Sequence, residues 1–180
     1  MHQLRTHHKH KEGRIFAWMA LMIALAVGLT RPIFPNFVKL FVGTEQAVSI
    51  FYAAMAAVML LSALGSTFIL HKITRTKIIK FALIISGIVF LSFIFVTRIH
   101  TLAILETLRI WLEMILLVTL GLFVRDFAKK HNLGREEGLH YKFQNIGTFI
   151  GPLLGGFIAI KFGYEFVFIA ASLVTFYTFI

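Results

Sequence analysis

Three ionisable side chains interrupt one of the most apolar stretches of this 180-residue sequence. In TLAILETLRIWLEMILLVTLGLFV, residues 101–124, Glu106 and Arg109 are three residues apart, and Arg109 and Glu113 are four apart. Side chains at these spacings share one face of a helix. A charge near the middle of a membrane costs at least ~2.5 kcal/mol by insertion scales, so in a bilayer this face must point into a helix bundle or a water-filled cavity.

The chemistry open to such a group is proton binding. Burial disfavours the charged form of a carboxyl group, whereas a nearby guanidinium favours it, and Glu113 beside Arg109 experiences both effects. A substrate or a conformational change that separates the pair would leave the carboxylate ready to take up a proton. We therefore expect Glu106, Arg109 and Glu113 to form a substrate or proton site. The structural alternative is a self-neutralising triad that holds helices together.

The composition indicates the environment of these charges. The sequence is 58% hydrophobic, only 14% charged, and contains 20 Phe, whereas about a quarter of the residues in an average soluble domain are charged. A soluble domain of this size keeps much of its surface in water and cannot bury so many apolar side chains. The sequence therefore predicts an all-α integral membrane protein in contact with the lipid bilayer.

Six apolar stretches predict transmembrane helices, since about 20 residues, in a range of roughly 17–25, cross the ~30 Å hydrocarbon core. The expected spans are residues 15–37, 47–70, 78–97, 101–124, 143–161 and 164–180. The first is long enough only if the helix continues through Arg31 and Pro32. The sixth is about one turn short, and we expect the chain to be a fragment that ends within this helix.

The first 14 residues form a basic segment with four of the eight histidines. We expect residues 1–14 to be a solvated, disordered cytoplasmic tail, and a metal-binding tail is the alternative. A basic segment before a 16-residue apolar stretch also resembles a signal peptide, although five more spans follow. The sequence has no cysteine, and no metal site is expected elsewhere.

The distribution of Lys and Arg predicts the orientation, because both favour the cytoplasmic side in short loops. Thirteen lie in the N-terminal segment and in the second-to-third and fourth-to-fifth connections, against four in the alternate connections. The N-terminus is therefore expected in the cytoplasm, with the plasma membrane (the cell inner membrane) as the location. The same asymmetry explains the net charge of +10 without a nucleic-acid partner.

Motifs for cofactor chemistry are missing from the sequence. It has no P-loop Gly-Lys-Ser/Thr and no His-Glu-x-x-His, the patterns that hold nucleotide phosphates or zinc. We expect no cofactor and no enzymatic activity. A membrane-embedded enzyme is the alternative, and it would need a second cluster of reactive side chains inside the membrane.

The stretch FQNIGTFIGPLLGGF, residues 143–157, places helix breakers inside an apolar segment. They are Gly147, Gly151, Pro152, Gly155 and Gly156. Glycines four residues apart form a groove that lets another helix approach closely, and proline bends a helix. We expect a seam between this helix and a neighbour that holds tightly in one conformational state and slides in another. Gly151→Leu should then block the change between the two states but not membrane insertion. A static packing seam is the alternative.

This stretch resembles the Gly-Pro antiporter motif of the major facilitator superfamily, roughly G-x-x-x-G-P-x-x-G-G, at every position. Arg109 resembles the arginine of the family's fourth-helix motif, with Glu113 where glycine is usual. The loop HKITRTK is similar to the family's second-to-third loop, with His71 and Thr74 where Asp and Gly are usual. The resemblance implies a cytoplasmic gate made of His71, Lys72, Arg75, Lys77, Arg125 and Asp126.

The resemblance also implies the N-terminal six-helix half of a transporter, in which two halves rock about a central substrate site. The expected function is secondary active transport of a small molecule by alternating access, with proton-coupled efflux preferred over uptake. The missing C-terminal half would be a partner. A non-transporting scaffold or assembly subunit and a non-functional fragment are the alternatives. Six phenylalanines are expected either to line a drug cavity or to face lipid: Phe143, Phe149, Phe157, Phe162, Phe166 and Phe168.

Overall fold

The structure, a computed structural model, describes residues 2–70, 74–127 and 133–179. Every regular element in these ranges is helical. The elements are α1 (His2–Thr30), α2 (Phe34–Val42), α3 (Glu45–Leu70), α4 (Arg75–Ser92), the short 3₁₀ helix η1 (Phe93–Phe95), α5 (Ile99–Phe127), α6 (Leu133–Phe162) and α7 (Tyr164–Phe179). Of the expected gate residues, His71 and Lys72 lie outside the described residues.

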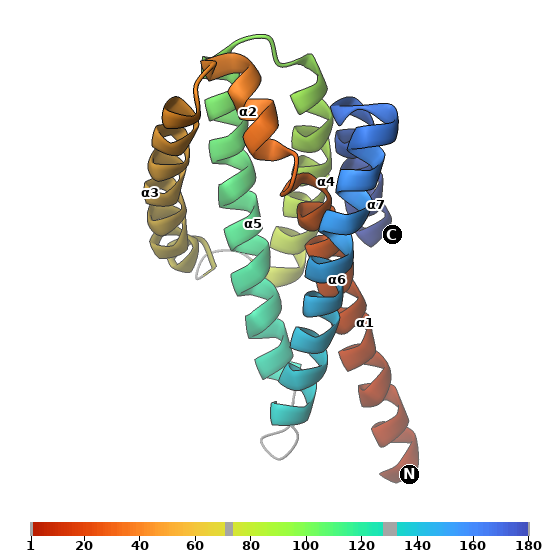
Figure 1. The fold of residues 1–180 in the computed structure, drawn as a ribbon. Coiled ribbons are helices and arrows are strands. Elements are labelled where there is room, and N and C mark those ends of the chain that lie inside the picture. Colours follow the sequence, from red (N-terminus) through yellow and green to blue (C-terminus); the bar gives the residue numbers. More distant parts are fainter. Residues whose placement is uncertain (1, 71–73, 128–132, 180) are drawn as a thin grey trace.

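The helices form an up-and-down bundle. The connections from α2 to α3, from α4 to α5 and from α6 to α7 lie at one end, and the N-terminus, the end of α5 and the start of α6 lie at the other (Figure 1). We call the first the loop end and the second the N-terminal end. The segments expected on the cytoplasmic side thus belong to the N-terminal end wherever they are described.

Five segments are long and apolar enough to cross a membrane. They are residues 15–42, 45–66, 75–95, 99–126 and 133–162. The sixth expected span is α7, whose 16 described residues extend about 24 Å at 1.5 Å per residue, less than the ~30 Å hydrocarbon core. The described residues therefore support five spans and a shorter apolar helix.

The first span is broken. Residues 15–42 count as one apolar segment, but α1 ends at Thr30 and α2 begins at Phe34. Proline lacks an amide donor and disfavours helical geometry in the residue before it, and Pro32 and Pro35 both fall near the break. The chain continues past Arg31 as expected, but as two helices instead of one.

Two segments expected to lack regular structure are helical. The helix α1 begins at His2 instead of at residue 15, so the segment 2–14 is not a disordered backbone. The helix α6 begins at Leu133, ten residues before the expected span. Adding residues to an existing helix costs little compared with nucleation, and Glu136 lies in the first turn of α6, where a negative charge favours the helix dipole.

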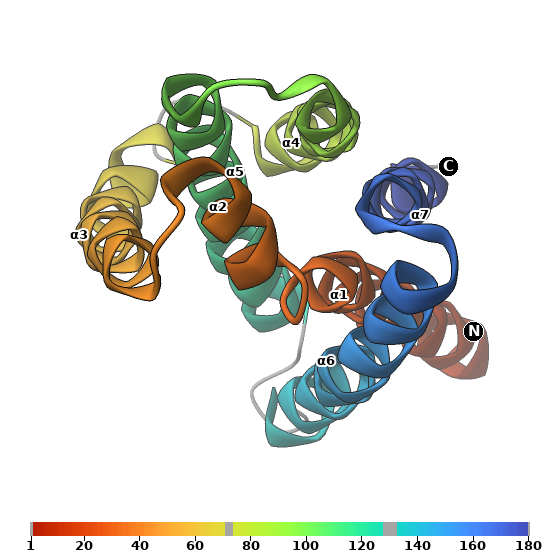
Figure 2. The same cartoon turned by 45° about the horizontal axis from the view of Figure 1, so that its top comes forward.

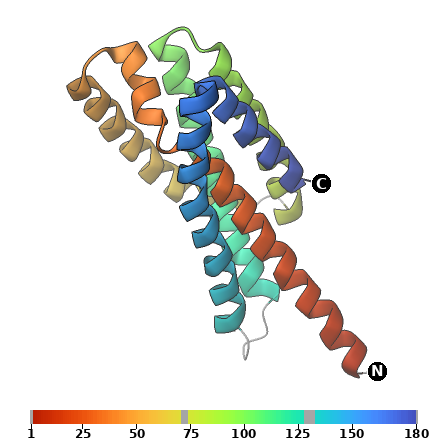
Figure 3. The same ribbon diagram turned by 45° about the vertical axis from the view of Figure 1, so that its right-hand side comes forward.

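The closest helix pairing joins α1 to α6, which are distant in sequence and side by side in the fold (Figure 3). Gly147, Gly151 and Gly155 of α6 are all buried. A Cβ atom on Gly147 would lie 2.5 Å from the carbonyl oxygen of Leu21, and one on Gly155 would overlap the carbonyl oxygen of Leu29. The glycine stripe is therefore a helix seam, and its partner is α1.

An aromatic cluster fixes the loop end of the bundle. The Phe37 and Phe168 rings meet edge to face at 5.0 Å, Phe93 stacks on Phe168 at 5.2 Å, and Phe34 meets Phe93 at 5.5 Å. These rings join α2, η1 and α7. The helix α3 lies at the edge of the bundle (Figure 2) and packs mainly against α5, so a large part of its surface is left open.

Candidate substrate and ion-pair site

The three charged residues of the fourth span form one hydrogen-bonded group. The Arg109 guanidinium donates to both carboxylate oxygens of Glu106, with Nε···Oε2 and Nη2···Oε1 distances of 2.7 Å. It also donates to Glu113, with an Nη1···Oε2 distance of 2.9 Å. A bidentate pairing of this kind is both strong and geometrically specific. The expected placement on one helix face is confirmed, and Arg109 is held by both carboxylates.

The two carboxylates differ in their surroundings. The side chain of Glu106 is 4% exposed, that of Arg109 is 15% exposed, and that of Glu113 is 27% exposed. Glu113 has a second cationic neighbour, because its Oε1 lies 4.0 Å from a guanidinium nitrogen of Arg31. Glu106 is therefore the buried anchor of the group, and Glu113 is the member best placed to exchange partners.

The group lines a cavity of about 460 Å³. The walls come from the end of α1, the break, the start of α2, one face of α3 and the middle of α5. Small-molecule sites usually measure about 300–1,000 Å³ and combine apolar walls with a few polar groups. Arg109 and Glu113 both line this cavity. Side chains that faced lipid could not have formed a substrate or proton site.

Several lining residues were not expected from the sequence. They are Phe34, Tyr52, Met55, Met59 and Met114, together with Arg31. Phe34 connects the site to the aromatic cluster, because the Arg109 guanidinium carbon lies 5.8 Å from the centre of its ring. The break at Pro32 was a usable signal for Arg31 and Phe34, since non-helical backbone at membrane depth occurs where it lines a cavity or is buried in protein.

The six phenylalanines that were expected either to line a drug cavity or to face lipid do not line this cavity. Phe149, Phe157, Phe162 and Phe166 are exposed on the outside of the bundle, and Phe168 is buried in the aromatic cluster. Phe143 packs edge to face on Trp18 at 5.8 Å. Of the two alternatives, the exposed residues fit contact with lipid. For the three on α6, the seam turns the glycine face of the helix inward and leaves the opposite face outward.

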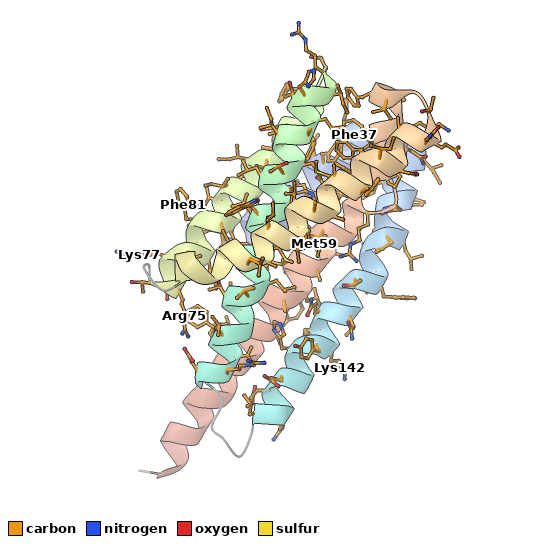
Figure 4. The ribbon with its side chains drawn as sticks, turned by 90° about the vertical axis from the view of Figure 1, so that its left-hand side faces the viewer. Phe37, Met59, Arg75, Lys77, Phe81 and Lys142 are labelled. Carbon is orange, nitrogen blue, oxygen red and sulfur yellow. The ribbon has the colours of Figure 1, made fainter. Side chains whose placement is uncertain are left out.

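The expected gate residues are partly brought together at the N-terminal end. Arg75, at the start of α4, forms a salt bridge with Asp126 near the end of α5. Arg125 instead pairs with Glu137 of α6 at 3.1 Å. Lys77 is exposed near the start of α4 (Figure 4). Of the six residues expected in the gate, Arg75 and Asp126 therefore pair with each other, whereas Arg125 belongs to a different pair.

Comparison with known proteins identifies the family of this arrangement. The sequence profile described as Major Facilitator Superfamily matches residues 16–180. The chain belongs to the Major Facilitator Superfamily. Membership agrees with the Gly-Pro stretch and with Arg109, and it fits the five candidate membrane spans of the described residues.

One curated protein gives a more specific comparison. The chain is 29% identical over 156 residues to the multidrug resistance protein MdtG of Dickeya zeae (strain Ech586). The match covers 84% of this chain and 38% of the relative. The chain thus spans less than half the length of that relative.

Proposed function

We propose that this chain is the N-terminal half of a secondary transporter that moves a small molecule by alternating access. The transport is efflux, and it is coupled to protons. The observation that carries the proposal is Arg109, held between two carboxylates on the wall of a cavity of about 460 Å³. Charged groups inside a membrane protein usually mark a substrate or ion pathway.

The geometry supports a specific proton step. Arg109 makes two hydrogen bonds to Glu106 but one to Glu113. A proton bound by the Glu113 carboxylate gives a neutral carboxylic acid, which weakens its attraction to both Arg109 and Arg31. The guanidinium then remains held by Glu106, while the cavity wall near Glu113 loses one negative charge. Proton binding and substrate binding would compete at this position.

The cavity walls favour a lipophilic organic substrate. Met55, Met59 and Met114 supply flexible, polarizable surface that adapts to different shapes, and Phe34 and Tyr52 supply aromatic faces that attract organic cations. The printed name of the relative, a multidrug resistance protein, is consistent with this chemistry. We therefore propose a lipophilic cation or neutral aromatic compound as the substrate class.

We further propose that the open apolar faces of α3 and α6 contact lipid and the second half of the transporter. These two helices are the least buried of the five candidate spans, yet α3 contributes one wall of the cavity. A central site between two halves needs such a surface. In this arrangement the N-terminal end faces the cytoplasm, and the protein resides in the cell inner membrane.

The proposal is tested by efflux of a fluorescent aromatic cation, ethidium, from cells that express the chain together with its second half. Glu113→Gln and Arg109→Ala should each abolish the dependence of efflux on the pH gradient. Glu165→Gln, an exposed carboxylate at the start of α7, is the matched control and should leave efflux unchanged. Unchanged efflux and pH dependence in both cavity variants would refute the site, and no efflux by the wild type would favour a non-transporting scaffold.

A further inference from the structure

His140 of α6 is a buried histidine that the proposed cavity does not include. Only 9% of its surface is exposed, and its Nδ1 atom is fully buried without a hydrogen-bond partner in the described part of the chain. A neutral imidazole carries one donor and one acceptor nitrogen, and buried polar atoms are normally paired. A ring nitrogen that no protein group pairs at this depth is a position where a water molecule or a proton can bind.

This side chain lines two further cavities. The first, of about 210 Å³, extends along α5 and α6 towards the exposed ion pair of Arg125 with Glu137 at the N-terminal end. The second, of about 80 Å³, is lined by His140, Arg31 and Glu113. His140 and Leu117 line both cavities. A cavity needs roughly 10–15 Å³ of such space to hold a water molecule, so the second cavity, which His140 and Glu113 both line, is large enough for water.

Polar side chains continue from His140 along one face of α6. Gln144 and Thr148 follow at intervals of four residues and line the same small cavity as Glu113, and Glu137 precedes His140 by three. Residues three and four apart share a helix face. The face therefore runs from Glu137, near the N-terminal end, past His140 towards Glu113 in the membrane interior, beside the glycine seam with α1.

We propose that His140 is a proton-binding residue that connects the Arg125–Glu137 end of the molecule with Glu113. One ring nitrogen accepts a proton that enters from that end, and the imidazolium then releases a proton, through water in the small cavity, to the Glu113 carboxylate. The transfer leaves a neutral imidazole and a carboxylic acid, and one proton has moved. Histidine suits this role because its charge changes near neutral pH.

The charge surroundings of His140 are mixed. The titratable and charged groups that share a cavity with it come from α5, from α6 and from the break after α1: Glu113, Arg125, Glu137, Tyr141 and Arg31. Two carboxylates and two guanidinium groups nearly cancel one another, and Tyr141 packs edge to face on the imidazole at 5.6 Å. A change in the protonation of Glu113 alters this balance, so the two sites should sense each other.

The first test measures the histidine directly and does not depend on transport. The purified full chain is labelled at the histidine ring carbons and titrated by NMR, with the His140 signal identified by its loss in His140→Gln. The signal should titrate with pH, and Glu113→Gln should shift its midpoint. The signal of His100, an exposed residue near the loop end of α5, is the control and should not respond. A His140 signal that ignores either pH or Glu113→Gln overturns the inference.

The second test rests on the proposed proton-coupled function. In efflux of ethidium, His140→Gln should remove most of the pH dependence while efflux itself persists, and His100→Gln should behave as the wild type. Wild-type efflux without pH dependence would refute the proposed coupling, whereas wild-type pH dependence that survives in a folded His140→Gln variant would refute the role of His140 alone. Size-exclusion chromatography and circular dichroism confirm that each variant is folded.

Discussion

Gly151 of α6 lies directly against Gly28 of α1, and a Cβ atom on Gly151 would lie 2.7 Å from the Cα atom of Gly28. The obstacle is backbone, which cannot rotate away as a side chain does. Gly151→Ala should therefore push α1 and α6 apart and destabilise the protein by about 1–3 kcal/mol, the usual cost of overpacking. Thermal unfolding of the purified protein measures the loss.

Gly156 is the matched control for this seam. It belongs to the same motif, but a Cβ atom there would meet nothing within 4 Å. Gly156→Ala should leave the melting temperature within error of the wild type or raise it. Equal destabilisation by the two substitutions would show that the seam is not the reason for the glycines. Gly151→Leu, which places a larger side chain against Gly28, should also stop transport.

Removal of the Glu106 charge should destabilise the protein more than removal of the Glu113 charge. Glu106 is almost fully buried and makes the bidentate contact with Arg109, whereas Glu113 is 27% exposed and makes one contact. Breaking a buried ion pair costs about 3–5 kcal/mol, because the remaining charge is left uncompensated. Glu106→Gln should therefore lower the melting temperature clearly and Glu113→Gln only slightly.

The two substitutions should also differ in their effect on transport. Glu113→Gln should affect the pH dependence of efflux at a small cost in stability, whereas Glu106→Gln should reduce the amount of folded protein. A larger loss of stability in Glu113→Gln than in Glu106→Gln would contradict the assignment of Glu106 as the anchor.

Sequence spacing was sufficient for some features of this site and insufficient for others. The common face of Glu106, Arg109 and Glu113 follows from helix geometry alone, and so does the glycine stripe of α6. The identity of α1 as the partner of that stripe is a long-range contact that no local pattern encodes. The early start of α6 was missed because its charged first turns are as polar as a loop.

The phenylalanines show a second limit of prediction from the sequence. Their number predicted a membrane protein correctly, but hydrophobicity alone does not distinguish a lipid-facing ring from a core ring or a cavity wall. Phe149, Phe34 and Phe168 have the same side chain but different environments. Phe149 is exposed on the outside of the bundle, Phe34 lines the cavity, and Phe168 is buried in the core. Only the packing of the helices separates them.

The salt bridge between Arg75 and Asp126 should contribute little to stability but should matter for the position of α4 relative to α5. Both side chains are partly exposed, at 34% and 55%, and exposed pairs contribute about 0–1 kcal/mol. Asp126→Arg should reduce efflux through repulsion of Arg75. The double variant Arg75→Asp with Asp126→Arg should restore efflux, and failure of the swap to restore it would argue against a role for this pair in gating.

Filling the cavity offers a direct test of where substrate binds. Ala56 of α3 lines the cavity and Ala57 does not, although both are exposed residues of the same helix. Ala56→Phe adds a ring to a space of about 460 Å³ and should raise the apparent KM for ethidium several-fold. The fold should tolerate the change, because the new ring enters open space instead of the packed core.

Ala57→Phe adds the same ring to the same helix outside the cavity, so it should leave the KM unchanged. The difference between the two variants isolates occupancy of the cavity from any general effect of a larger side chain on α3. Equal KM values for Ala56→Phe and Ala57→Phe would place substrate elsewhere. Arg109 and its two carboxylates would then act as an internal brace between helices, not as part of the binding site.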